Sequence, residues 1–94
     1  MPYTVAIRGA LARYLLSTPN PAIRRRLAVL RLHPFPPGSR SLGADPEWEA
    51  LSERFQGRGG FLYGTNDDAL VYTLDHARSR IVVEFAVVGG ELVP

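Results

Sequence analysis

Residues 69–88 read ALVYTLDHARSRIVVEFAVV, and this stretch decides the fold. Its first part is rich in β-forming residues and places Leu70, Tyr72 and Leu74 on one face, which is typical of a β-strand. Its last part, Arg80–Val88, is largely apolar on both faces and predicts a strand that is central or covered. Because only a short loop separates the two strands, we expect them to pair antiparallel.

The last strand divides its side chains between the two faces of the sheet. Alternation assigns one face to Ile81, Val83, Phe85 and Val87. It assigns the other face to Val82, Glu84, Ala86 and Val88. A preceding strand is predicted over residues 61–65 with a turn at residues 66–68, so the C-terminal third forms a three-stranded meander that ends at Gly89-Gly90.

The N-terminal third predicts one strand followed by two helices. Tyr3–Arg8 alternates and indicates a short strand with one buried face. Ala10–Ser17 is rich in helix formers. A second helix starts after Asn20, a favourable N-cap, and runs to about His33. Its apolar stripe consists of Ile23, Leu27 and Leu30.

A proline-rich linker and a shorter helix separate the two halves. The linker is His33–Gly38, whose prolines fix φ and remove donors, and the shorter helix is predicted over Pro46–Phe55. The order is therefore β-α-α-(short α)-β-β-β. This order predicts one α+β domain over residues 1–94, with an antiparallel sheet and two helices packed on one of its faces.

Composition limits the function classes. The chain has 94 residues, no cysteine and a net charge of +2, with 46% hydrophobic residues. The lack of cysteine excludes disulfides and thiolate metal sites. There is no apolar run of eighteen or more residues and no recognisable signal peptide, so we expect a cytoplasmic protein that does not span a membrane. We expect no cofactor and no metal, since the two histidines lack ligand partners at metal-binding spacing.

All eleven basic residues are arginines, and these are the main candidates for a site. Planar guanidinium groups bind phosphate or carboxylate through two hydrogen bonds at once. A GC-rich genome would also explain the preference for arginine, and nine acidic residues offset the charge. The candidate residues for binding a nucleic acid or a partner are Arg24, Arg25, Arg40, Arg58, Arg78 and Arg80.

Several local patterns, taken with the order of elements, resemble the RelE/ParE superfamily of bacterial toxins from toxin–antitoxin modules. The opening strand from Tyr3 and the helix after it resemble the first two elements of that family. The linker with Leu32-His33-Pro34 and residues 38–42 resembles the family's "L-x-N-P…G-x-K-x-L" pattern. Residues 67–75 resemble "G-D-Y-R-V-I-Y-x-V-D", and residues 81–88 resemble the final hydrophobic strand.

The chain departs from this family at the positions that carry ribonuclease chemistry. The strand arginine of the family falls on Ala69, and its terminal His-Arg pair falls on Gly89 and Gly90. Only the basic residue of the linker is kept, as Arg40. Loss of one such electrostatic donor costs about a hundredfold or more in rate, so loss of several predicts little family-type catalysis.

Three functional hypotheses follow. In the first, the chain is a toxin-like protein that acts by binding its antitoxin and a target such as gyrase or the ribosome. In the second, it is a ribosome-dependent mRNA endonuclease that uses relocated groups, for which the candidates are Arg40, Arg54, Arg58 and His76. In the third, it is a non-toxic structural module that forms a homodimer through its apolar last strand.

Overall fold

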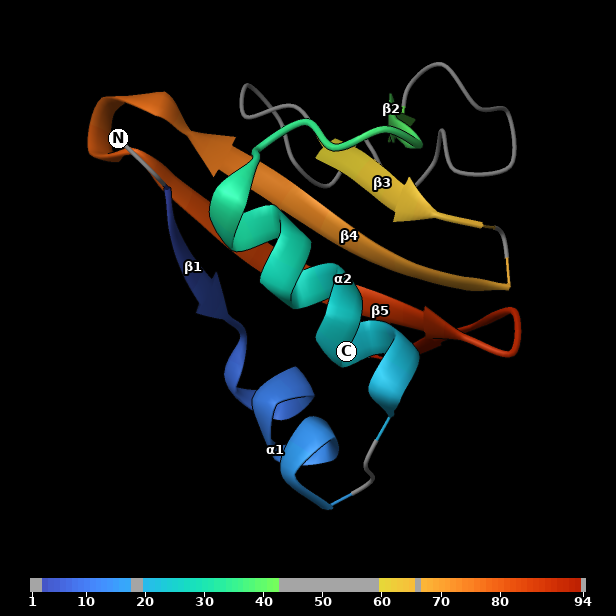
Figure 1. Cartoon of the computed structure of the whole chain (residues 1–94). Helices are drawn as coiled ribbons and strands as arrows, with labels where there is room; N and C mark the ends of the chain where they lie inside the picture. Colours follow the sequence, from blue (N-terminus) through green and yellow to red (C-terminus); the bar gives the residue numbers. More distant parts are fainter. Residues whose placement is uncertain (1–2, 18–19, 43–59, 66, 94) are drawn as a thin grey trace.

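The computed structural model of the chain describes residues 3–17, 20–42, 60–65 and 67–93. These residues form two helices and a sheet, which confirms the α+β class (Figure 1). The elements in chain order are β1 (Thr4–Ile7), α1 (Gly9–Ser17), α2 (Pro21–Leu32), β2 (Ser39–Ser41), β3 (Gly60–Gly64), β4 (Asp68–Asp75), the short 3-10 helix η3 (His76–Arg78), β5 (Arg80–Val88) and β6 (Glu91–Val93). The short helix predicted over residues 46–55 lies outside the described residues.

The described strands form one sheet with the order β1-β5-β4-β3-β2, and β6 pairs with the far end of β5. The meander β3-β4-β5 is antiparallel, as predicted. The first strand differs from the expectation, because β1 pairs with β5 in parallel, from Thr4 opposite Arg80 to Ile7 opposite Val83. β5 therefore has neighbours along both edges. A homodimer stays an alternative, but it could not form by pairing of a second strand along an edge of β5 that is already paired.

Two strands of three residues each were not predicted. Ser39–Ser41 continues the proline-rich linker as the edge strand β2 beside β3, and Glu91–Val93 turns back after Gly90 as β6. Three residues are too few to show an alternating pattern, so neither strand has a local sequence signal.

Both helices pack on one face of the sheet, as predicted (Figure 1). Leu11 and Leu15 of α1 join the stripe of α2 in a core with Leu70, Tyr72 and Leu74 of β4. The α2 stripe is the predicted one, namely Ile23, Leu27 and Leu30. α2 starts where Asn20 predicted, since the Asn20 side chain accepts a hydrogen bond of 3.2 Å from the backbone N–H of Ile23. Neither helix of this described portion is long and apolar enough to cross a lipid bilayer.

The predicted division of β5 between the two faces is wrong beyond residue 84. Val71 pairs with Phe85 and Tyr72 pairs with Val83, so Glu84 is an extra residue that forms a β-bulge. The bulge shifts the alternation by one. Ala86 therefore packs in the core under the helices, together with Ile81 and Val83. Phe85 and Val87 pack on the opposite face of the sheet, with Leu42, Leu62, Ala69 and Val71.

Tyr72 of β4 contacts both the neighbouring strand β3 and the proline-rich linker. Its ring stacks on that of Phe61 at a centroid distance of 5.6 Å, and its hydroxyl donates to the carbonyl of Pro34 at 2.9 Å and lies 3.2 Å from Oγ of Ser39. Burial raises the pKa of Tyr72 above its usual range, and the hydrogen bond with Ser39 offsets this only in part. The neutral phenol is thus the form that the folded state favours.

The raised pKa of Tyr72 predicts a loss of stability in alkali. A group whose pKa is higher in the folded than in the unfolded chain contributes stability that is complete below the unfolded pKa, about 10 for tyrosine. That contribution disappears as the pH rises through the folded pKa. We expect the free energy of unfolding, measured in urea from pH 8 to 11, to fall more steeply for the unaltered chain than for Tyr72→Phe. Parallel curves would show that Tyr72 is not the titrating group.

Candidate functional site

The arginines of α2 lie on the helix side of the molecule. Arg24 is exposed, and its guanidinium donates to the carbonyl of Leu15 at 3.2 Å, so it stabilises the C-terminal end of α1. Arg25 is also exposed and lines a hollow of about 240 Å³ together with Arg26 and Tyr63. The Arg26 guanidinium lies 5.4 Å from the centre of the Tyr63 ring, which is a cation–π contact.

The other candidate arginines lie elsewhere. Arg40 is on β2 at one edge of the sheet, and Arg80 is the first residue of β5. Arg78 is exposed in η3, where its Nε lies 3.8 Å from a carboxylate oxygen of Asp75. Arg54 and Arg58 lie outside the described residues. The candidate arginines that the structure describes are therefore not brought onto one common surface.

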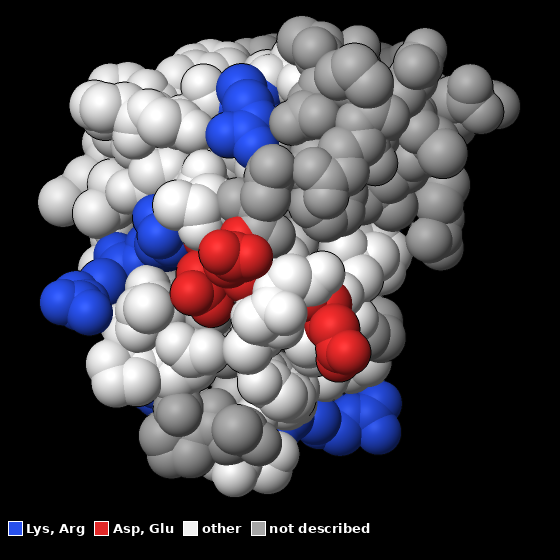
Figure 2. Space-filling model, turned by 90° about the vertical axis from the view of Figure 1, so that its right-hand side faces the viewer, with Lys and Arg blue, Asp and Glu red and all other residues white. Residues whose placement is uncertain are grey.

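Charges of both signs mix on the face shown in Figure 2. Acidic side chains lie between basic ones there, and no continuous basic area forms among the coloured residues of that view. This distribution agrees with the modest net charge of +2. On this face, a polyanion would therefore meet acidic as well as basic side chains.

His76 has a hydrogen-bonding partner at the β1 edge of the sheet. Its Nδ1 lies 2.9 Å from the hydroxyl of Tyr3, and the two rings meet edge to face at 6.2 Å. Arg40 lies on β2 at the opposite edge. The structure therefore does not bring together the two described residues of the relocated catalytic set.

Three residues stand where the resembled family has catalytic side chains, and their own side chains cannot replace them. Ala69 is fully buried in β4. Gly89 and Gly90 form the turn from β5 to β6 with φ values of 60° and 82°, and the N–H of Gly90 donates to the carbonyl of Asp67 at 2.9 Å. Among the described residues no group of three or more His, Asp or Glu side chains is placed to hold a metal ion.

An apolar groove runs between the two helices. We call this hollow of about 290 Å³ the α1–α2 groove, and its lining is Ile7, Ala12, Leu15, Leu16, Arg24, Leu27 and Arg31. Leu16 is 81% exposed although it is a large apolar side chain. The lining leucines give the groove an apolar centre, and Arg24 and Arg31 lie at its border. Sequence analysis missed this groove, although the leucine pair Leu15 and Leu16 lies within the predicted helix Ala10–Ser17.

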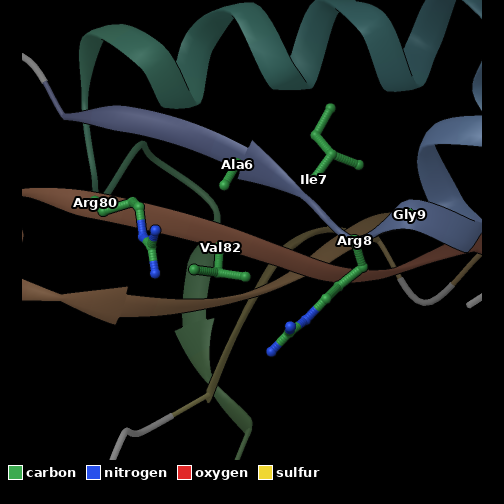
Figure 3. Close-up of a pocket in the computed structure, with 6 residues that line it drawn as sticks. All are labelled: Ala6, Ile7, Arg8, Gly9, Arg80 and Val82. Atoms are coloured by element: carbon green, nitrogen blue, oxygen red, sulfur yellow. The ribbon is translucent and has the colours of Figure 1, made fainter.

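A second hollow, of about 250 Å³, lies on the sheet face opposite α2 (Figure 3). We call it the Arg8–Arg80 pocket, and its lining is Ala6, Ile7, Arg8, Gly9, Arg80 and Val82. Nε of Arg8 donates to Oε1 of the buried Glu84 at 2.7 Å, and Oε2 of Glu84 accepts from the hydroxyl of Thr73 at 3.0 Å. The hydrogen bond and the negative charge of Glu84 raise the pKa of Arg8.

No family model, curated protein or solved structure matches the chain.

Proposed function

We propose that this chain is the toxin-like component of a bacterial toxin–antitoxin module and that it acts by binding other macromolecules. The observation that carries this proposal is the α1–α2 groove with the exposed Leu16. The resemblance of the sequence patterns to the RelE/ParE superfamily supports the same function. In the proposal, the partner in the groove is an antitoxin segment, and the eventual target is gyrase or the ribosome.

The groove suits an amphipathic helix with acidic flanks. Its apolar lining gives such a helix a place for residues at i, i+3 or i+4 spacing, and Arg24 and Arg31 border the same hollow. Covering a leucine as exposed as Leu16 would contribute up to about 2 kcal/mol from removal of apolar surface. Carboxylates on the partner would add charge-assisted hydrogen bonds to the two arginines.

Binding is favoured over RNA cleavage because of the residues that stand where the resembled family has its catalytic side chains. Ala69 is buried, and Gly89 and Gly90 are turn residues, so none of the three has a side chain that can hold a scissile phosphate or move a proton. The endonuclease alternative would need Arg40 and His76 to act together, but Arg40 lies on the edge strand β2 and His76 lies in η3 between β4 and β5, against Tyr3.

The proposal is tested with two matched variants and the product of the neighbouring gene. Leu16→Glu places a carboxylate in the groove, and we expect it to weaken binding of that product at least tenfold, since it removes apolar burial and repels acidic residues. Leu32→Glu is the control, because Leu32 is 83% exposed and does not line the groove. Calorimetric titration of the purified proteins measures both dissociation constants.

Growth of cells that express the chain alone, and then with the neighbouring product, gives a second readout. We expect the chain alone to slow growth and the partner to restore it. A neighbouring product that does not bind, together with normal growth on expression alone, would contradict the proposal. Equal weakening by Leu16→Glu and Leu32→Glu would instead contradict the assignment of the groove.

A further inference from the structure

We propose that the Arg8–Arg80 pocket binds a phosphate group. This proposal is independent of the α1–α2 groove, because the pocket lies on the sheet face opposite α2 (Figure 3). Neither Arg8 nor Arg80 stands at one of the positions compared above with the ribonuclease residues of the family, which are Ala69, Gly89, Gly90 and Arg40. Arg8 ends the first predicted strand and Arg80 begins the last one, so the parallel pairing of β1 with β5 brings them together.

Two arginines stand on the same side of a flat apolar floor. Ala6 and Val82 are cross-strand partners and line the pocket between them. The side chains of Arg8 and Arg80 both project from this floor away from α2, while Ile7 points toward it (Figure 3). An anion on the floor would therefore meet a guanidinium group from each side.

Arg80 has one hydrogen-bond donor that no acceptor in the described part of the chain satisfies. Its Nε is buried and has no hydrogen-bonding partner among the described residues. Buried donors are almost always paired, and a charged group left unpaired is costly. Asp75 lies opposite Arg80 in the β4–β5 register, but its carboxylate is engaged with the backbone N–H and the guanidinium of Arg78. An anion bound in the pocket would balance the charge of the Arg80 guanidinium.

The start of α1 adds a positive partial charge. Gly9 lines the pocket and is the first residue of α1, a helix with no acidic residue in its first turn. The hydrogen bond from the N–H of Ala12 to the carbonyl of Arg8 begins the helical series. The N–H groups ahead of it have no intrahelical acceptor, as at every helix N-terminus, and the helix dipole favours an anion there.

Glu84 lowers the positive charge of the Arg8–Arg80 pocket but does not cancel it, because the pocket has two arginines. Glu84 accepts a hydrogen bond from Nε of Arg8, and a guanidinium has five N–H donors in all, so a second anion could bind to other donors of Arg8. The described residues of the lining include no aromatic ring on which a base could stack. The pocket is therefore suited to the phosphate group itself, whether free, at the end of a nucleotide or within an RNA backbone.

Titration of the full chain with inorganic phosphate at constant ionic strength, followed by NMR of the backbone amides, tests the proposal. We expect saturable shifts at residues 6–10 and 80–82. Arg80→Gln should weaken binding about tenfold or more, as loss of a hydrogen bond to a charged group does. Arg78→Gln is the matched control, because Arg78 is exposed, two residues away and outside the pocket.

The variant Gly9→Asp shows whether phosphate binding can be weakened while the chain stays folded. A Cβ at Gly9 would meet no atom within 4 Å, and an acidic residue in the first turn stabilises a helix. We therefore expect Gly9→Asp to unfold no earlier than the unaltered chain and yet to bind phosphate several-fold more weakly. This variant remains informative even if Arg80→Gln fails to fold.

Parallel titrations with adenosine 5′-monophosphate and with a short RNA lacking terminal phosphates distinguish the sources of the group. Tightest binding of the monophosphate would assign a terminal phosphate, and tightest binding of the RNA would assign a phosphodiester. The proposal would be overturned if none of the three ligands gave saturable shifts at the pocket. It would also be overturned if neither Arg80→Gln nor Gly9→Asp weakened the binding, or if Arg78→Gln weakened it as much as Arg80→Gln.

Discussion

Replacement of Gly64 by alanine is expected to lower the free energy of unfolding by about 3 kcal/mol or more. Gly64 ends β3 with a φ of 133°, a conformation that other residues rarely adopt. A Cβ there would overlap the carbonyl oxygen of Asp68 and lie 2.8 Å from Cα of Ala69. Both atoms belong to the backbone of β4, which pairs with β3 at this point, so the strands would have to separate locally.

Alanine variants at two other glycines distinguish the cost of the overlapping Cβ from the cost of a positive φ. Gly38 has a φ of 93° but open space around a Cβ, so Gly38→Ala should cost only about 1–2 kcal/mol. Gly9 has neither a positive φ nor a close neighbour, so Gly9→Ala should cause no loss. Urea unfolding of the three variants checks the order. A Gly64→Ala variant as stable as Gly9→Ala would show that the β3–β4 turn is built differently.

Leu30→Ala is expected to cost about 2–5 kcal/mol, because it opens a cavity between α2 and the sheet. Leu30 is fully buried and belongs to the core that includes Leu70 and Tyr72 of β4. For a chain of this size such a loss lowers the thermal midpoint by about 10 °C or more.

Leu32 supplies the control for this experiment. It lies on the same helix two residues away and is 83% exposed. Leu32→Ala should change stability by no more than about 0.5 kcal/mol. Equal losses for the two variants, measured by thermal unfolding, would mean that the stripe of α2 is not what faces the sheet.

The helices were predictable because their signals are local. The spacing of Ile23, Leu27 and Leu30 defines the buried stripe of α2, and Asn20 marks its start within one residue. The core positions of β4 were predictable for the same reason, since Leu70, Tyr72 and Leu74 alternate within one short segment.

The errors arise where pairing between distant segments decides the structure. Glu84 looks like an ordinary alternating residue, but pairing with β4 makes it a bulge that reverses the faces of Phe85 and Ala86. The direction of β1 depends on its pairing with β5, more than seventy residues later. No local pattern reports either fact.

The candidate sites also divide into those with a local sequence signal and those that depend on pairing between distant segments. Leu16 follows Leu15 within the predicted helix Ala10–Ser17, and two consecutive leucines cannot both face the core of a helix packed on one side, so the exposed apolar side chain had a local signal. Arg8 and Arg80 become neighbours only once the register of β1 against β5 is known. Arg24, Arg40 and Arg78 could be named from the sequence as cations, but not assigned to separate places: the end of α1, the β2 edge and the β4–β5 turn.

The footprint of the neighbouring gene's product on this chain tests most directly whether the α1–α2 groove is the binding surface. Amide hydrogen exchange of the chain, measured with and without that product, gives the footprint residue by residue. The account predicts slower exchange over residues 9–17 and 21–32, centred on Leu16 and Leu27, with the β2–β3 edge unchanged. Slower exchange confined to the sheet, with α1 and α2 unaffected, would contradict it.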